Sequence, residues 1–172
     1  MSKCIYSFLL LFSLLSCIKD DVEKAGTFEL KVGDTLPVFS ISNNKESLSA
    51  ADLQNKIVLI VFFNTKCKDC QREFATMDKL YRSYFDNTSV RVLMIARGQT
   101  EKEVFDYFLP INYTFSYFAD PSCTVYSLFA DNTIPRLFLT GKDGKIVLTQ
   151  KEYVDLEVVM DIIEELQVPQ MQ

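Results

Sequence analysis

The sequence contains no histidine and no tryptophan among its 172 residues. Without histidine, Ser–His and Cys–His catalytic pairs are excluded, and so is the commonest metal-ligating side chain. Basic residues are also outnumbered: 18 lysines and arginines stand against 23 acidic residues, which gives a formal net charge of −5. Because such a chain offers no basic surface to neutralise phosphates, we do not expect nucleic acid as a partner.

Long hydrophobic runs are scarce, and the N-terminal one resembles an export signal. Lys3 precedes an apolar run from Ile5 to Leu15, which is too short to span a bilayer as a helix but suits a secretory signal. The LLSC that closes this run resembles a bacterial lipobox. That resemblance implies removal of residues 1–16 and lipid attachment to Cys17, with a plain signal peptide or an uncleaved anchor as the alternative.

Residues 17–30 are predicted to form the lipid anchor and a polar tether. Cys17 is followed by Ile-Lys-Asp-Asp, which resembles the signal that sends some Bacteroidota lipoproteins to the outer face of the outer membrane. We therefore expect an outer-membrane lipoprotein, periplasmic or on the cell surface. A solvated charged tether explains the same four residues.

Residues 31–168 are predicted to form one domain, with 169–172 as a short tail. The apolar runs Ile57–Phe63 and Val90–Ala96 are typical of strands covered on both faces. Other segments predict short strands at 38–41 and 114–118 and hairpin strands at 136–140 and 146–149. Helices are predicted at 49–53, from 68 to about 85, from Thr100 to Pro110, at 121–129 and at 155–166. This order favours one mixed sheet between helices.

Cys67 and Cys70 lie where the first buried strand leads into a helix. Unpaired N–H groups and the positive end of the helix dipole favour a thiolate there, and Lys66 and Lys68 add positive charge beside Cys67. Cys70, one turn further on, lies on the same side and within disulfide reach. The pair therefore predicts disulfide exchange with Cys67 as nucleophile and Cys70 as resolving cysteine, which needs no metal or organic cofactor.

Two other uses of the pair are less favoured. A metal site needs four ligands, and only Cys123 and carboxylates could supply the others, because the chain has no second CxxC. A structural disulfide in so short a loop would constrain the unfolded chain very little. Cys123 itself begins a predicted helix, where a thiolate would be favoured, but a lone cysteine is more often a small buried apolar residue.

Several motifs occur in a characteristic order: VGDTLPVFSI, LSAADLQNKIVLIVFF, CKDC, YFADPSCTVYSLF and NTIPRLFLTGKDGKI. From about Gly33 to Leu166 the chain resembles the thioredoxin superfamily, most of all its extracytoplasmic TlpA/ResA-type thiol-disulfide oxidoreductases. The resemblance implies an α/β thioredoxin fold with a central mixed sheet, helices on both faces and an N-terminal TlpA/peroxiredoxin-type extension. It also implies reduction of disulfides in extracytoplasmic proteins, with protein thiols and disulfides and a membrane electron donor or acceptor as partners.

The family's second landmark matches Thr133-Ile134-Pro135. The resemblance implies that Pro135 follows a cis peptide bond opposite the cysteines. It also implies that the backbone of Ile134 binds an extended substrate segment like a neighbouring strand. An ordinary trans proline at the start of a strand is the alternative.

Three positions depart from the family pattern. Lys66 stands where tryptophan often precedes the first cysteine, and Asp69 stands where proline often precedes the second. Val61 falls where thioredoxin has a buried acid that relays protons to the resolving cysteine. These changes leave redox poise, direction and partner choice open, but not the dithiol chemistry.

Two rival functions fit the sequence less well. A peroxiredoxin-type peroxidase needs Thr or Ser three residues before its peroxidatic cysteine and proline four residues earlier still. Counting back from either cysteine does not give this pattern: the residues are Asn64 and Ile60, or Cys67 and Phe63. The rival from another class is a non-catalytic binding module on a thioredoxin scaffold, against which the intact cysteine pair argues.

Overall fold

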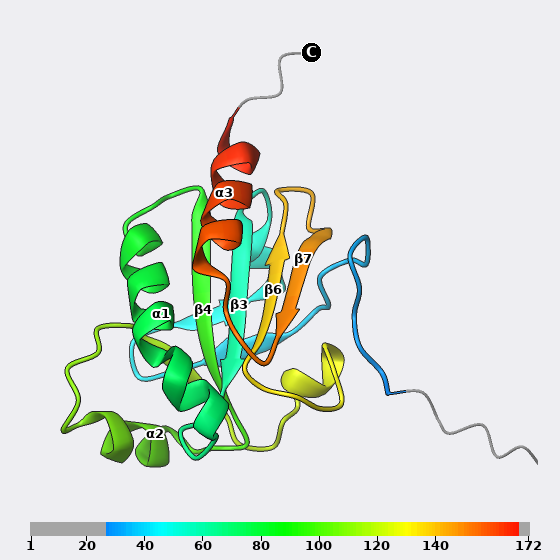
Figure 1. The fold of residues 1–172 in the computed structure, drawn as a ribbon. Helices are drawn as coiled ribbons and strands as arrows, with labels where there is room; N and C mark the ends of the chain where they lie inside the picture. The colour runs from blue at the N-terminus through cyan, green and yellow to red at the C-terminus, as the bar shows by residue number, and fades with distance from the viewer. Residues whose placement is uncertain (1–26, 169–172) are drawn as a thin grey trace, which may run out of the picture.

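The computed structural model describes residues 27–168 (Figure 1). The predicted signal peptide, the lipidation site Cys17, residues 17–26 of the tether and the tail 169–172 lie outside the described residues. None of the helices in the described range is both long enough and apolar enough to cross a bilayer. Residues 28–30, which the sequence places in the tether, lie against the domain: the backbone of Leu30 donates to Phe129 and that of Asp131 donates to Phe28.

A five-stranded mixed sheet forms the centre, as predicted. Its strands run in the order β5-β4-β3-β6-β7, with β3, β4 and β5 parallel and β6 and β7 antiparallel to their neighbours. The bounds are Ile57–Phe63 for β3, Val90–Arg97 for β4, Tyr117–Asp120 for β5, Arg136–Thr140 for β6 and Ile146–Lys151 for β7.

The central strand β3 is buried along its whole length. Because successive side chains of a strand point to opposite faces, its residues divide between two cores. Ile57, Leu59, Val61 and Phe63 pack into one core, and Val58, Ile60 and Phe62 pack into the other. A continuous apolar run, rather than an alternating one, is what a strand covered on both sides requires.

The first face is covered by three α-helices. They are α1 (Lys68–Tyr84), α2 (Glu101–Phe108) and α3 (Leu156–Gln167), and Figure 1 shows α1 and α3 on the same side of the sheet. Phe74 of α1 lies in this core with its ring edge-on to that of Phe63, 5.7 Å between centroids. The predicted capping box of α2 is present, since Thr100 and Glu103 exchange hydrogen bonds between side chain and backbone.

The second face is covered by a hairpin and two 3-10 helices. The hairpin, β1 (Ser40–Ser42) with β2 (Ser47–Ser49), is the N-terminal extension, and the 3-10 helices are η1 (Ala50–Leu53) and η2 (Tyr126–Leu128). Helical segments therefore lie on both faces, but those of the second face are short.

The helix predicted at 121–129 is wrong in extent. Only the 3-10 turn η2 forms, because Cys123 adopts a left-handed backbone conformation, with φ of 56°. The strand before it also begins later than predicted, at Tyr117 instead of Thr114.

Candidate active site

The turn between β3 and α1 holds the two cysteines. Cys67 is the N-cap residue of α1; its N–H donates to the carbonyl of Asn64 (3.1 Å) and its own carbonyl accepts from Gln71 (3.0 Å). Cys67 is half-buried, Cys70 is fully buried, and both are free thiols. The predicted placement at the start of a helix after a central strand is therefore present, with one sulfur accessible and the other enclosed.

Buried amides fix this turn. Gln99 accepts from the backbone N–H of Thr65 (2.7 Å) and donates to its hydroxyl (2.6 Å), and both side chains are buried. Asn64 donates through Nδ2 to the carbonyl of Arg97 (2.9 Å) and accepts from the N–H of Lys66 (2.8 Å). Sequence reasoning missed this network, because a glutamine after one strand gives no local sign that it pairs with a turn after another.

Ile134 lies opposite the exposed thiol. The Ile134–Pro135 peptide bond is cis, as the resemblance implied, and the Sγ of Cys67 lies 3.6 Å from the carbonyl oxygen of Ile134. The residues before it are held by Tyr126, whose hydroxyl lies 2.8 Å from the carbonyl oxygen of Thr133 and also contacts that of Asn132. Tyr126 was not identified from the sequence.

The two thiols differ in burial, and burial changes the pKa of Cys70. Desolvation raises the pKa of the Cys70 thiol well above its ordinary value; the backbone of Asn64 opposes this in part, and the neighbouring Cys67 adds to it. Because the protonated form is favoured, Cys70 is a thiol at neutral pH in the reduced protein. Cys67 is the sulfur that an external disulfide can reach.

The charges predicted to flank Cys67 are partly neutralised. Lys66 Nζ lies 2.9 Å from Glu103 on α2, and Asp69 pairs with Arg72. Hydrogen bonds from the backbone of Thr100 and from Lys66 lower the pKa of Glu103 to about 2, so this carboxylate stays charged. The ammonium of Lys66 is therefore paired with a carboxylate of α2.

Two further positions lie near Cys70 in sequence or in the same core. Val61, where thioredoxin has its proton-relaying acid, is fully buried in the same core as Cys70. The position that holds the relaying acid in thioredoxin is therefore apolar in this chain. Glu73, one turn beyond Cys70, is half-buried and accepts a hydrogen bond from the N–H of Val154 (3.3 Å).

Cys123 packs away from the pair. Its sulfur lies beside Gly98, and the residue contacts the core of the second face, whereas Cys67 and Cys70 pack in the first. Within residues 27–168, no three histidine, cysteine, aspartate or glutamate side chains are grouped as a metal site would require.

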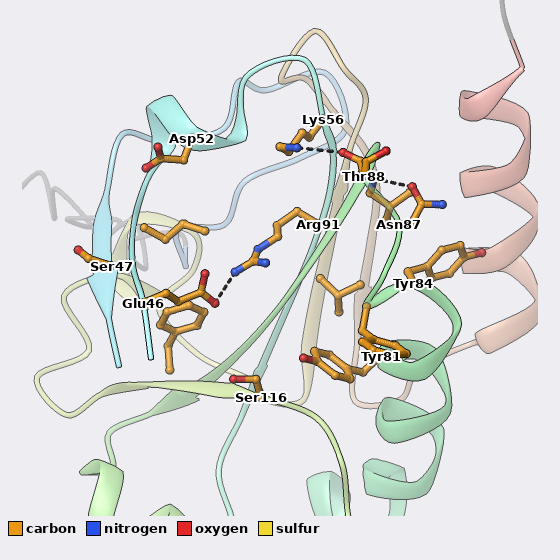
Figure 2. A pocket seen from close by; sticks show the side chains of 15 residues that line it. Glu46, Ser47, Asp52, Lys56, Tyr81, Tyr84, Asn87, Thr88, Arg91 and Ser116 are labelled. Atoms are coloured by element: carbon orange, nitrogen blue, oxygen red, sulfur yellow. Dashed lines mark hydrogen bonds and ion pairs between the residues drawn. The ribbon is translucent and has the colours of Figure 1, made fainter. Parts of the chain in front are cut away.

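A polar cavity of about 410 Å³ lies at the other end of α1 (Figure 2). Tyr81 and Tyr84 of α1 form one wall, while Arg91 of β4 reaches across to Glu46 beside the hairpin. Neither cysteine lines it, and the 17 residues of α1 separate it from Cys67 by about 25 Å. This cavity is therefore separate from the cysteine pair.

Known proteins share both sequence and fold with this chain. A family model described as the AhpC/TSA family matches residues 32–149. Over 120 residues the chain is 26% identical to the thiol-disulfide oxidoreductase ResA of a Bacillus cereus strain, a match that covers 69% of each chain.

Solved structures support the fold. A solution structure from Bacteroides thetaiotaomicron, described as a candidate protein disulfide isomerase, matches with a TM-score of 0.71 and 22% identity over 81% of this chain and 89% of its own. The exposed lipoprotein thioredoxin of Streptococcus pneumoniae strain TIGR4 matches with a TM-score of 0.65 and 17% identity, over 75% of this chain and 99% of its own. The predicted thioredoxin-like fold is thus confirmed.

The difference between the two sulfurs predicts selective alkylation. In the reduced, folded protein at pH 7.5, brief treatment with iodoacetamide should modify Cys67 at least about tenfold faster than Cys70, because Cys70 is buried and its raised pKa keeps it protonated. Peptide mass spectrometry measures modification at each cysteine separately. In denaturant the two cysteines should be alkylated at similar rates. Equal rates in the folded protein would contradict the conclusion that Cys67 is the accessible thiol and Cys70 the buried one.

Proposed function

The chain belongs to the AhpC/TSA family, and on this premise we propose that it is a thiol-disulfide oxidoreductase that exchanges disulfides with other proteins through Cys67 and Cys70. The observation that carries this proposal is the position of the Cys67 sulfur, accessible at the start of α1 and 3.6 Å from the Ile134 carbonyl. The similarity to the thiol-disulfide oxidoreductase ResA supports the same reaction.

The proposed reaction has two steps. The thiolate of Cys67 attacks one sulfur of a substrate disulfide, the substrate S–S bond breaks, and the departing sulfur takes up a proton. Cys70 then loses its proton and attacks the Cys67 sulfur of the mixed disulfide, which releases the second substrate thiol. The substrate gains two electrons and two protons, and Cys67 and Cys70 are left joined as a disulfide.

The segment around Ile134 and Pro135 is proposed to bind the substrate. Ile134 is half-buried at the surface beside Cys67, and Pro135 is buried behind it. An extended substrate segment that pairs with the Ile134 backbone would carry its disulfide to the Cys67 sulfur. Because the contact is made mainly with backbone, it accepts many sequences.

The direction we propose is reduction of extracytoplasmic disulfides, with a membrane partner returning electrons to the Cys67–Cys70 disulfide. We further propose that Cys17 carries the lipid and that the domain is held at the outer membrane, facing the periplasm or the cell surface. The similar pneumococcal protein is an exposed lipoprotein thioredoxin, which supports a thioredoxin domain on a lipid anchor.

Trapping tests the proposed roles. A Cys70→Ser variant mixed with a disulfide-bonded peptide should accumulate a mixed disulfide on Cys67, because no resolving thiol remains to release it. A Cys67→Ser variant should form none, since the remaining Cys70 is buried. Intact-mass and peptide mass spectrometry detect the adduct and its site.

Cys123→Ser provides the matched control for this experiment. It removes a cysteine that lies outside the pair and should reduce the peptide at the wild-type rate. An adduct on Cys123 instead of Cys67, or full reducing activity in Cys67→Ser, would refute the proposed roles. A wild-type protein that neither reduces the peptide nor forms an adduct would favour a non-catalytic module.

The lipid anchor has a separate test. The protein expressed with its native N-terminus in a bacterium that lipidates exported proteins should start at Cys17 and carry acyl chains, and it should partition with membranes. Cys17→Ala should lose the acyl mass and leave the membrane fraction, while Cys4→Ala should behave as wild type. Acylation that persists in Cys17→Ala would refute this attachment site.

A further inference from the structure

Arg97 is the last residue of β4 and is half-buried. Within residues 27–168 it has no carboxylate partner, and its Nε is buried without a hydrogen-bond partner. The other four arginines of the chain all form ion pairs: Arg72 with Asp69, Arg82 with Asp78, Arg91 with Glu46 and Arg136 with Glu29. Arg97 is thus the one arginine of the described residues whose guanidinium has no carboxylate partner within the fold.

An aromatic ring, and not a carboxylate, holds the guanidinium of Arg97 in place. Its Cζ lies 4.5 Å from the ring centroid of Tyr126, in a cation–π contact that orients the planar group. Tyr126 is itself almost fully buried and fixed through its hydroxyl to the carbonyl of Thr133. A planar, oriented guanidinium loses little freedom on binding a carboxylate through two parallel hydrogen bonds.

Two chains of contacts place Arg97 beside the reactive sulfur. Along one, the Arg97 carbonyl accepts from Asn64, and the Asn64 carbonyl accepts from the N–H of Cys67. Along the other, the guanidinium covers Tyr126, which holds Thr133, and the next residue, Ile134, contacts the sulfur of Cys67. Arg97 therefore lies at the same edge of the sheet as the dithiol, on the side of the Ile134 segment.

Two other cations near this segment are already paired with carboxylates. Arg136, which follows Pro135, pairs with Glu29, and Lys66 pairs with Glu103. The Asp131 carboxylate, which also lies near this segment, accepts a hydrogen bond from the backbone of Phe28 (2.7 Å). Among the described residues, two cations beside the site have no ion pair: Lys68, an exposed ammonium on a flexible side chain, and Arg97, whose planar guanidinium is held over the Tyr126 ring. Of these two, only the guanidinium can bind a carboxylate through two parallel hydrogen bonds.

We propose that Arg97 forms a carboxylate-binding subsite, which takes an aspartate or glutamate side chain of the polypeptide whose disulfide is exchanged at Cys67. This rests on the proposed function and adds a substrate preference to it: extended segments with an acidic residue close to the cysteine. The backbone of Ile134 binds the segment whatever its sequence, and Arg97 selects among segments. Arg97 makes no bond to the reacting sulfurs, so it affects binding and orientation only.

A pair of peptides tests the subsite. Two disulfide-bonded peptides are made identical except for aspartate or asparagine at one position, and the series is repeated at each of the two positions on either side of the cysteine. The second-order rate constant of reduction is measured for the mature wild-type protein. At the best position the aspartate peptide should react about tenfold faster than its asparagine counterpart, and the preference should shrink as salt is raised.

Three variants test whether Arg97 causes the preference for the aspartate peptide. Arg97→Gln should lose the aspartate preference and keep the wild-type rate with the asparagine peptide, which shows that the fold and the dithiol are intact. Arg97→Lys should keep part of the preference, because charge remains without the planar fork. Lys142→Gln removes an exposed charge from the distant β6–β7 turn and should keep the whole preference.

The outcomes separate this proposal from the proposed function. If the wild type reduces both peptides equally at every position, or if Arg97→Gln keeps the preference, the subsite is refuted and the exchange reaction stands. If Arg97→Gln slows both peptides by the same factor, Arg97 only supports the fold, and the subsite is again refuted. If the wild type reduces neither peptide, the proposed function fails and the subsite with it.

Discussion

The turn between β3 and α1 is the constraint on which the site depends. The strand must be buried on both faces and the helix must cover one of them, so the chain has only four residues, 64–67, in which to change direction. The first cysteine of the pair then lies at the helix N-terminus and is half-buried, and the second lies one turn further along the helix and is fully buried. One backbone geometry thus makes Cys67 accessible and keeps Cys70 protonated.

Polar side chains hold the β3–α1 turn and the segment before Pro135, which we propose binds the substrate, in place. Gln99 and Asn64 fasten the turn to β4, while Tyr126 fastens the carbonyls that precede Ile134. Arg97 contacts both groups of residues. Its carbonyl accepts from Asn64 in the turn, and its guanidinium lies over the ring of Tyr126. Asn64, Gln99 and Tyr126 therefore position both the sulfur and the backbone proposed to bind the substrate. Arg97 lies beside them and is the arginine without an ion pair among the described residues.

The sequence predicted the parts whose signals are local. The apolar run Ile57–Phe63, the periodic helix after Cys67 and the Thr100 capping box all formed, since each is set by its own residues. The helix predicted at 121–129 failed because Cys123 adopts a left-handed backbone conformation. The Asp120 carboxylate then accepts from the N–H groups of Val125 and Tyr126, beyond the residues that a helical N-cap reaches. Arg97 and Tyr126 could not be identified because their roles come from pairing between distant segments.

The central claim is that Cys67 and Cys70 form a reversible two-electron couple. Equilibration of the mature protein in dithiol buffers of graded potential, followed by acid quenching and mass mapping of free thiols, measures this couple directly. We expect one transition in which only these two sulfurs join while Cys123 stays free, with a reducing midpoint near the value of about −270 mV typical of thioredoxin. Pairing of either sulfur with Cys123, or thiols that never join at any potential, would contradict the account.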